Sequence, residues 1–338
     1  MRVICLVEHP DHVCCRYRLS ALIPHLRARG IALEPVSLPR NLFARLRLFS
    51  RLKNQPVILQ RKLLSWIELK LLRSNASWLA FDLDDAVFLR DSYASKGHQD
   101  GRRSRRFTRL MAVADCVFAG NHFLAEQSRT HGAKGRVTVI PTSINPDLYT
   151  PKSSSQAHSP SGRGLQMTWI GSSSTLQGLE RMAPLFDRIG TRIPGITLRV
   201  ISDRFPVFEK LNVVNIPWSG QSEARELASG DVGISWIPDD PWSRGKCGLK
   251  VLQYMAAGLP VLANPVGVHP EIIRPGQEGF LPATDEEWLE KLDYFDKNRP
   301  ELNAMGHLGR QRVENDYSVA NAARLVVDAI REISGSAA

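Results

Sequence analysis

The chain has 338 residues, of which 43% are hydrophobic, and its Lys and Arg outnumber its Asp and Glu by 44 to 34. This length is enough for two domains with a sizeable core each, and too great for one ordinary core. The five cysteines form no Cys-x-x-Cys pair and no metal-ligand spacing, which argues against a disulfide framework and for reduced thiols in the cytosol. No apolar run approaches the roughly 18 residues that cross a bilayer, and the first one, broken at Glu8, is typical of a strand rather than a signal peptide.

The positive charge is concentrated in the first half of the chain. Residues 1–150 hold 24 basic and 12 acidic residues, a net charge of +12, whereas residues 151–338 hold 20 and 22, a net charge of −2. This asymmetry indicates that the first half faces an anionic partner such as phospholipid headgroups, a lipid diphosphate, an acidic glycan or nucleic acid. An Arg-rich composition inherited from a GC-rich genome is the competing explanation.

The first 150 residues alternate between apolar runs and helix-length amphipathic segments. Helices are expected at 18–28, 62–73 and 122–131. Strands that alternate with helices in this way predict a doubly wound parallel α/β sheet. Runs rich in Val and Ile predict its buried strands at 2–7, 31–36, 57–60, 78–82, 116–119 and 137–140.

A segment rich in Ser, Pro and Gly, residues 151–164, interrupts this pattern and is interpreted as an exposed linker. The predicted fold is therefore two Rossmann-like domains, residues 1–150 and 165–317, with parallel sheets that face each other across a cleft and ligand crevices at the carboxyl ends of the strands. After the linker, strands are expected at 166–170, 197–201, 212–216, 232–236, 260–263 and 279–281, and helices at 175–189, 222–229, 249–257, 285–298 and 319–333.

The stretch 244–267 carries the clearest chemical signal. A loop containing glycine leads into the helix expected at 249–257, and a helix N-terminus offers unpaired N–H groups that suit a diphosphate. Lys246 and Lys250 put positive charge near the start of this helix, where it is unfavourable unless an anion binds. An ordinary loop and helix with two solvated lysines is the alternative.

The same stretch resembles the donor-binding motif of glycosyltransferase family 4, in which a loop leads into a helix reading Glu-Ala-Met-Ala-x-Gly-x-Pro-Val. The match lies in Gln253-Tyr-Met-Ala-Ala-Gly-Leu-Pro-Val261 and continues through Asn264-Pro-Val-Gly267. It is closest to a subgroup with Lys-Cys-Gly in the loop and Gln-Tyr-Met in the helix. Other similar segments follow in the family's order over almost the whole chain: 81–88, 114–121, 139–145, 169–172, 230–234 and 313–318.

This resemblance implies a GT-B fold and transfer of a sugar from a nucleotide-diphosphate sugar with retention of configuration, with no metal and no other cofactor. It also implies that the last helix, residues 318–338, packs back on the N-terminal domain. The residues implied to bind the donor nucleotide and diphosphate are Gly171, Ser172, Ser173, Arg204, Lys246, Cys247, Gly248, Leu249, Lys250 and Gln253.

Several departures from the family pattern concern the donor. Gly245 and Gln253 stand where the family has two glutamates, of which the first faces the donor sugar and the second the ribose. Gln253 can still bond a ribose diol through its amide, whereas Gly245 has no side chain to recognise the sugar. Ser172 and Gln177 replace an Arg and a Lys that hold the diphosphate in many members, so the cationic residues named above are expected to supply the missing charge.

An acidic group, Asp82-Leu-Asp84-Asp85, follows a predicted strand of the first domain. Asp84 or Asp85 is expected to accept a hydrogen bond from a sugar or acceptor hydroxyl, with general-base catalysis as a lesser role. Together with Lys250 they are the predicted catalytic residues. Binding of a divalent cation and local capping of the next segment are the alternatives.

Three residues near the first loop, His9, Arg16 and Arg18, are expected on the acceptor side, where an Arg suits a phosphate of donor or acceptor. A solvated helix surface explains the arginines equally well, and a lone His is more often structural or exposed.

The segment 40–53 combines five basic residues with six Leu and Phe and has no acid. Such a segment can lie on an anionic membrane, with Leu42, Phe43 and Phe49 in the interface and Arg45, Arg47 and Arg51 at the phosphates. A core-facing helix with solvated arginines is the alternative. A second basic cluster lies at 102–106, and no interleaved aromatic platform or motif indicates nucleic acid.

The leading interpretation is a cytoplasmic glycosyltransferase, peripheral on the inner membrane face if the basic segment binds lipid. Its acceptor would be a glycan, a lipid-linked molecule or a small molecule in glycan, polysaccharide or glycolipid biosynthesis. The absence of both family glutamates leaves open a catalytically silent scaffold that binds sugar nucleotides. A GT-B epimerase that alters the nucleotide sugar without an acceptor is a third hypothesis.

Overall fold

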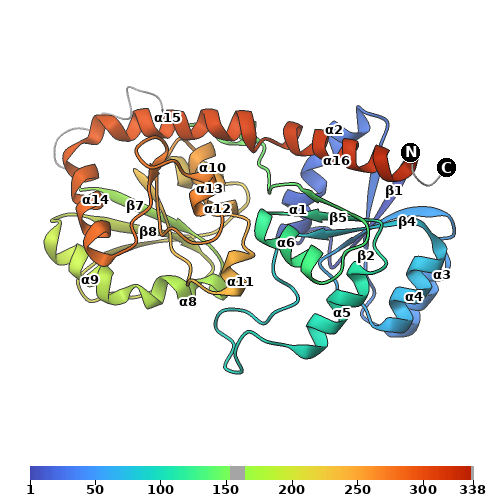
Figure 1. Cartoon of the computed structure of the whole chain (residues 1–338). Coiled ribbons are helices and arrows are strands. Elements are labelled where there is room, and N and C mark those ends of the chain that lie inside the picture. The colour runs from blue at the N-terminus through green and yellow to red at the C-terminus, as the bar shows by residue number, and fades with distance from the viewer. Residues whose placement is uncertain (153–163, 336–338) are drawn as a thin grey trace. The chain divides into compact units, whose positions relative to one another are not determined.

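The computed structural model describes residues 1–152 and 164–335, which form two compact α/β units (Figure 1). Unit 1 contains Met1–Ser143, Asp240–Cys247 and the segment that begins at Val319, and unit 2 contains Ile144–Asp239 and Gly248–Ser318. The expected linker at 151–164 lies for the most part outside the described residues. The division between Ser143 and Ile144 comes before the domain boundary expected at residue 150.

Unit 1 is built on a six-stranded sheet of order β2-β1-β3-β4-β5-β6, in which every neighbouring pair is parallel. The strands are almost continuous runs of apolar residues because helices cover both faces of the sheet. The predicted strands are confirmed, with ends within two residues of those expected: β1 (Arg2–Val7), β2 (Ala32–Ser37), β3 (Gln55–Gln60), β4 (Ala76–Leu83), β5 (Cys116–Ala119) and β6 (Arg136–Val139).

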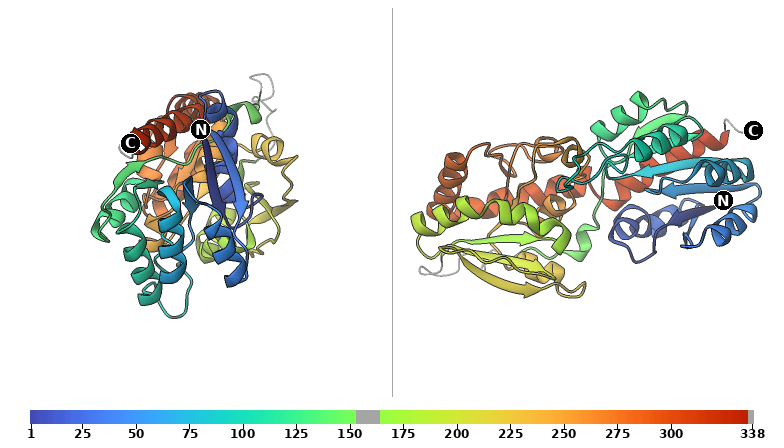
Figure 2. Two further views of the ribbon diagram at one scale, coloured as in Figure 1. Left: turned by 90° about the vertical axis from the view of Figure 1, so that its right-hand side faces the viewer. Right: turned by 90° about the horizontal axis from the view of Figure 1, so that it is seen from below.

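Two layers of helices cover this sheet (Figure 2). One face packs against α3 (Leu42–Ser50), α4 (Trp66–Asn75), α5 (Gly101–Met111) and α6 (His122–Thr130). The other packs against α1 (Val13–Arg18), η1 (Ser20–Leu22), α2 (Ile23–Arg27) and α16 (Val319–Gly335). The single helix expected at 18–28 is instead broken into three pieces, because Leu19 leaves the helical conformation (φ −127°) and Pro24 has no N–H to continue an earlier helix.

Unit 2 contains a second six-stranded parallel sheet, of order β12-β11-β10-β7-β8-β9. Its predicted strands are also confirmed to within one residue: β7 (Gln166–Ile170), β8 (Thr197–Ser202), β9 (Asn212–Pro217), β10 (Val232–Ser235), β11 (Val261–Ala263) and β12 (Gly279–Phe280). Its helices include α8 (Ser173–Arg181), α9 (Ala183–Arg192), α10 (Glu223–Ala228), α12 (Leu249–Ala256), α13 (His269–Ile272), α14 (Asp285–Lys297) and α15 (Arg299–Asp316). The helix expected at 175–189 is divided at Met182, two residues before Pro184.

Residues 240–247 belong to unit 1, although the strand before them and the helix after them belong to unit 2. This segment, which we call the strap, contains the short helix α11 (Pro241–Arg244). Within unit 1, Ser92 Oγ donates to Asp240 Oδ1 at 3.2 Å, and the Asn121 amide donates to the carbonyls of Arg244 and Lys246 at 3.1 and 3.0 Å. The strap therefore differs from the continuous second domain, 165–317, that the sequence predicts.

Candidate functional site

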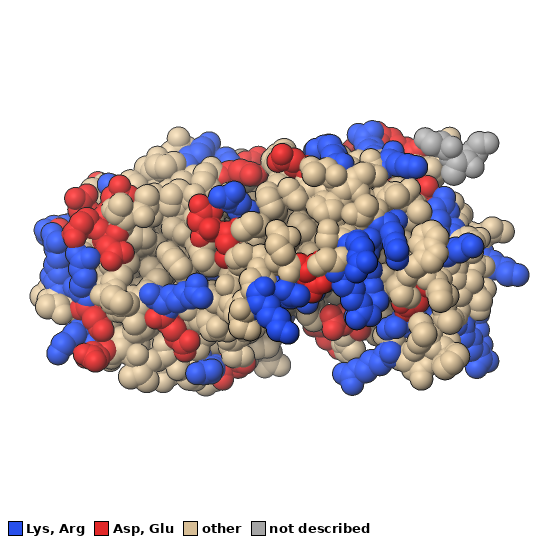
Figure 3. Space-filling model, turned by 60° about the horizontal axis from the view of Figure 1, so that its bottom comes forward, with Lys and Arg blue, Asp and Glu red and all other residues tan. Residues whose placement is uncertain are grey.

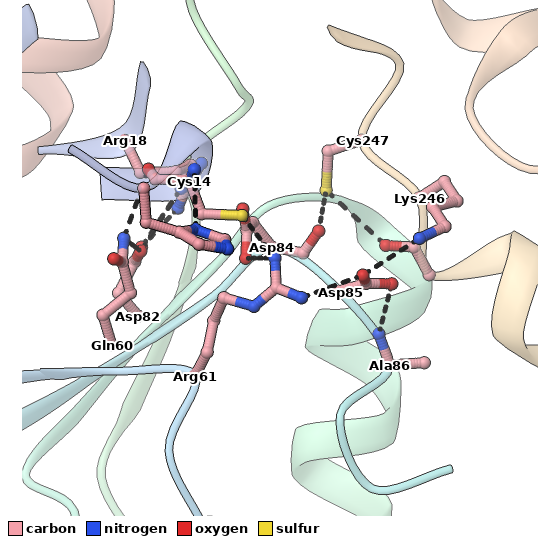
Figure 4. Close-up of polar contacts among 12 residues, drawn as sticks. Cys14, Arg18, Gln60, Arg61, Asp82, Asp84, Asp85, Ala86, Lys246 and Cys247 are labelled. Atoms are coloured by element: carbon pink, nitrogen blue, oxygen red, sulfur yellow. Dashed lines mark hydrogen bonds and ion pairs between the residues drawn. The ribbon is translucent and has the colours of Figure 1, made fainter. Parts of the chain in front are cut away.

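In unit 1, polar side chains gather at the carboxyl ends of β3 and β4, next to the point where the strand order reverses around β1 (Figure 4). Asp82 and Arg18 form the buried base of this cluster. Arg18 Nη2 lies 2.6 Å from Asp82 Oδ1, and Gln60 Nε2 donates to Asp82 Oδ2 at 3.0 Å. Burial opposes the positive charge of Arg18, but the Asp82 carboxylate outweighs burial and raises the pKa of the guanidinium above its ordinary value. Arg18, expected at a phosphate, is thus engaged inside the unit, where Ile140 O also accepts from it.

Asp84 and Asp85 share one cationic partner above this base. Arg61 lies 3.2 Å from Asp84 Oδ1 through Nη1 and 3.1 Å from Asp85 Oδ2 through Nη2. Lys246 Nζ also donates to Asp85 Oδ2, at 3.0 Å, and lies 4.7 Å from the centre of the Trp242 ring. Burial opposes the charge of Arg61, but the two carboxylates raise the pKa of Arg61. The structure therefore brings two predicted catalytic carboxylates together with one lysine that the sequence assigns to the donor.

The rest of the strap explains one departure from the family pattern. A Cβ atom added at Gly245 would lie 2.7 Å from Ala86 Cβ and 2.8 Å from Ala86 N, so this position has no room for a glutamate side chain. Next to it, the Cys247 thiol donates to Asp84 O at 3.3 Å, and burial raises the pKa of this thiol and keeps it protonated. Asn121, whose Oδ1 also caps α6, holds the strap through its amide and was missed as a site residue, although an Asn before a predicted helix is a recognisable cap.

Two acceptor-side residues, His9 and Arg16, have local partners. His9 Nδ1 is 3.6 Å from Asp11 Oδ2, and Arg16 Nη2 donates to Tyr17 Oη at 2.8 Å. Within residues 1–152 and 164–335, no group of three or more His, Cys, Asp and Glu side chains is arranged to hold a metal ion.

In unit 2, the strand order reverses between β7 and β10, and most of the predicted donor residues follow β7 or begin α12. Lys246 and Cys247 belong instead to unit 1. Lys250, in the first turn of α12, has its Nζ 4.5 Å from the centre of the Trp169 ring of β7. Gly248 begins this helix with a left-handed backbone (φ 69°), and no acidic residue lies in the first turn. The start of α12 and the end of β7 are therefore adjacent, as the two predicted donor segments require.

The Tyr254 side chain of α12 links β7 and β10. Its hydroxyl accepts a hydrogen bond from Ile170 N at 3.0 Å and donates one to Ile234 O at 3.1 Å. A Cβ atom at Gly233 would lie 2.2 Å from the Tyr254 ring, so the glycine of the Gly230–Ile234 segment makes room for this tyrosine. The bridge fixes α12 against the sheet and thereby positions its first turn.

The segment after β7 donates hydrogen bonds to a carboxylate in the segment after β8. Asp203 accepts hydrogen bonds from Ser173 N at 2.7 Å and from Ser173 Oγ at 2.9 Å, and these bonds lower the pKa of Asp203. Arg204, which follows, lies 3.8 Å from Glu180 on the surface. The N-terminus of α8 thus faces a carboxylate of the protein itself, and Gly171 is held to glycine because a Cβ would meet the Trp169 ring at 2.5 Å.

Gln253 lies inside a buried polar cluster. Its Nε2 donates to Glu223 Oε1 at 2.9 Å and to Tyr149 Oη at 3.4 Å, and Trp218 Nε1 donates to the other Glu223 oxygen at 2.7 Å. A carboxylate is therefore present beside residue 253, but it comes from α10. Sequence reasoning missed Glu223 because nothing local distinguishes it from any other acidic residue at a helix start.

His269 is a further buried polar residue that the sequence did not single out. Its Nδ1 is 2.8 Å from Asn264 O, which makes Nδ1 the donor, and Nε2 then accepts from Ser235 Oγ at 3.2 Å. Burial lowers the pKa of His269 to about 4, and nearby Lys250 acts in the same direction. The imidazole is thus neutral and ties α13 to the end of β10.

The residues predicted at a membrane surface lie on helix α3 of unit 1 or, in the case of Arg51, directly after it. Arg45 Nε is 2.6 Å from Glu68 Oε1 of α4, so it joins two helices, whereas Arg47 and Arg51 are exposed. Within the two described ranges, no helix is long and apolar enough to cross a membrane.

Comparison with known proteins connects this geometry to a family. Residues 181–328 match the family model described as glycosyl transferase-like. No curated protein matches the chain. Among solved structures, sucrose-phosphate synthase from Thermosynechococcus elongatus is similar at a TM-score of 0.77 and 16% identity, covering 99% of this chain and 100% of that one.

Two other solved structures resemble the chain over comparable lengths. A glycosyltransferase from Rickettsia africae has a TM-score of 0.72 and 14% identity, covering 98% of each chain. HepE from Anabaena, in complex with UDP and glucose, has a TM-score of 0.69 and 13% identity, covering 98% of this chain and 100% of that one. At these identities the structures establish the fold alone, and the family model covers less than half of the chain. The paired parallel sheets give the chain the GT-B fold, and residues 181–328 within it resemble a glycosyl transferase.

Proposed function

We propose that the chain transfers a sugar from a nucleoside-diphosphate sugar to a hydroxyl acceptor, with retention of configuration and without a metal ion. The observation that carries this proposal is the junction of α12 and β7 in unit 2. There the N–H groups at the start of α12 and the Lys250 ammonium lie beside the segment after β7, at the reversal of strand order. HepE, which has a similar fold, was solved in complex with UDP and glucose, and this supports a nucleotide-sugar donor.

The chemistry of this site is electrostatic. When the bond between the anomeric carbon and the diphosphate breaks, negative charge develops on the leaving oxygen. The dipole of α12 and the Lys250 ammonium are already oriented in the folded unit, so they stabilise this charge without reorganisation. Because the nearby His269 imidazole is neutral, it adds no second positive charge next to Lys250.

The acceptor is proposed to use unit 1, the more basic part of the chain. Asp84 and Asp85 are the groups proposed to accept a hydrogen bond from a sugar or acceptor hydroxyl. Arg61 holds both side chains in place, and Lys246 contacts Asp85 as well. An anionic glycan or lipid-linked acceptor at the inner face of the cytoplasmic membrane fits the excess of Lys and Arg in residues 1–150.

The first experiment removes Lys250. We expect Lys250→Ala to lower the turnover of donor hydrolysis and transfer about a hundredfold while leaving the midpoint of thermal unfolding nearly unchanged. Lys210→Ala is the matched control, because Lys210 is an exposed lysine of the same unit. Unchanged turnover in both variants, and in Lys246→Ala/Lys250→Ala, would show that the diphosphate does not bind here.

One observation favours a second candidate, a silent protein that binds sugar nucleotides. Gly245 has no space for a side chain, and the Gln253 amide already donates to Glu223, so neither family glutamate has a direct substitute in the same position. Titration calorimetry with uridine and guanosine diphosphates, beside a donor-hydrolysis assay, separates the candidates. Binding with no turnover for any donor tested supports the silent protein and contradicts the transferase proposal.

A further inference from the structure

Four large apolar side chains are exposed at the starts of two helices in unit 1. Phe43 is 79% exposed and Leu42 45% in the first turn of α3, and Ile67 is 70% exposed and Trp66 49% in the first turn of α4. Isolated exposed apolar residues need no explanation, but a group of them on one face marks an interaction site. We call these four residues the apolar tip.

The two first turns lie side by side. Arg45 Nε, in the first turn of α3, is 2.6 Å from Glu68 Oε1, in the first turn of α4. The other Glu68 oxygen accepts from Ser65 N at 2.8 Å, which completes the capping box of α4. Because the Glu68 side chain is only 5% exposed, this ion pair holds the two helix starts together. The apolar tip is therefore one patch rather than two separate ones.

Basic residues far outnumber acidic ones in the segments around the apolar tip. Residues 38–75 contain nine Lys and Arg and a single acid, Glu68, which is buried against Arg45. Arg47 and Lys70 are exposed one turn behind Phe43 and Ile67, and neither side chain has an ion pair within the described residues. On the face drawn in Figure 3, blue side chains gather over unit 1, which contains these helices.

The neighbouring helix α5 extends the positive surface. It carries five Arg and no acid within Gly101–Met111. Arg109 lies over the Trp66 ring, 5.8 Å from its centre, and a groove of about 370 Å³ lined by Trp66, Arg109, Ala112 and Val113 separates α4 from α5. Apolar residues framed by cations are complementary to the interface of a membrane with anionic phosphate headgroups.

We propose that the apolar tip and the cations behind it form a docking surface for an anionic phospholipid bilayer. Phe43 and Ile67 enter the boundary between headgroups and acyl chains, while Arg47 and Lys70 contact the lipid phosphates. The Arg45–Glu68 pair does not touch lipid and instead positions the tip. This assignment refines the expectation for segment 40–53: Phe49 is fully buried in the core, and Arg45 is used inside the unit.

The test is co-sedimentation of the full chain with vesicles of phosphatidylcholine alone, or mixed with an equal amount of phosphatidylglycerol. We expect partition onto the mixed vesicles only, weakened by added salt, and reduced about tenfold in Phe43→Ser/Ile67→Ser and in Arg47→Ala/Lys70→Ala. The matched control is Leu148→Ser/Val207→Ser, which removes two equally exposed apolar side chains from unit 2, 67% and 92% exposed, and should bind as the unmodified chain does.

All changed residues are at the surface, so thermal unfolding should be unaltered and reports on the fold of each variant. The proposal is overturned if the unmodified chain ignores anionic vesicles, or if both unit 1 variants still bind fully. It is also overturned if sedimentation velocity shows a dimer that Phe43→Ser/Ile67→Ser converts to a monomer, since the tip would then bind a second copy of the chain.

Discussion

The residue type at position 253 depends on Glu223, which is 30 residues away in the sequence but in contact in the folded chain. In unit 2 their side chains are 4% and 7% exposed, and the Gln253 amide donates to the Glu223 carboxylate. A glutamate at position 253 would place two carboxylates at this distance inside the protein, where both cannot remain ionised without a large cost. The glutamine is thus the residue type that the Glu223 carboxylate requires.

We therefore expect Gln253→Glu to lower the free energy of unfolding at pH 7 by about 2–3 kcal/mol. The loss should shrink as pH falls, because protonation of one carboxyl restores a donor between the two groups. Glu223→Gln/Gln253→Glu exchanges the partners and should recover most of the loss. Urea unfolding of the three proteins at pH 7 and pH 5 measures this, and equal stability of Gln253→Glu and the unmodified chain at pH 7 would contradict it.

His269 gives a second test at the scale of one residue. Its imidazole has a pKa of about 4 in the folded chain and an ordinary value of 6.5, so between these values the unfolded chain binds the extra proton. Stability should therefore fall as pH falls through this window, by about 3 kcal/mol from this residue. We expect the unmodified chain to have a higher free energy of unfolding than His269→Gln above pH 6.5, and this difference to disappear between pH 6.5 and 4. A difference in unfolding free energy that is constant with pH would exclude this role.

At the scale of elements, helix α15 depends on glycine for its contact with α12. A Cβ atom at Gly306 would lie 2.0 Å from Gly258 O, whereas the nearest atom to one at Gly309, a turn later, would be Met255 Cγ at 3.3 Å. The first neighbour is backbone and cannot move aside, but much of the second is a flexible side chain.

Gly306→Ala should consequently destabilise unit 2 by about 2 kcal/mol or more, despite the higher helix propensity of alanine. Gly309→Ala, in the same helix, should change stability far less. Chemical denaturation of both variants tests the difference. If the two substitutions lower the free energy of unfolding equally, Gly306 is not needed for close packing of α15 on α12.

The elements differ in how far the sequence predicts them. The strands were predictable because runs of Val and Ile bounded by turn residues are sufficient for a buried parallel strand. The breaks at Leu19 and Met182 and the long helix α15 were not, since α15 is rich in polar residues and contains two glycines whose purpose is a contact with another helix. For the site, the sequence identified Gly245 and Gln253 as departures. Their reasons, Ala86 and Glu223, lie far away along the chain and appear only in three dimensions.

At the scale of the whole molecule, neither unit is one continuous stretch of chain. Helix α16 supplies eight buried apolar residues to the core of unit 1, among them Val326 and Ile330. They share this core with residues of β1, the first strand of the chain. The strap adds Trp242 and Cys247 against the core on the other face. A fragment that ends at residue 150 therefore leaves apolar surface exposed on both sides of its sheet.

We expect residues 1–150, expressed alone, to bind a hydrophobic dye and to unfold without a cooperative transition, in contrast to the full chain. Adding α16 through a flexible linker should restore part of the cooperativity, because it covers one of the two faces. Dye fluorescence and thermal unfolding by circular dichroism measure both effects. A fragment that unfolds as cooperatively as the full chain would show that unit 1 needs neither later segment.

The place of α16 in unit 1 also has a consequence for biosynthesis. A ribosome releases β1 to β6 first and α16 only after the whole of unit 2, so one face of the unit 1 sheet stays only partly covered while the second unit is being made. Unit 2 has no such dependence on the last helix and can complete its core once Ser318 has emerged. The order of folding is therefore expected to be the reverse of the order of synthesis, and the interval between them is when the nascent chain most needs a chaperone.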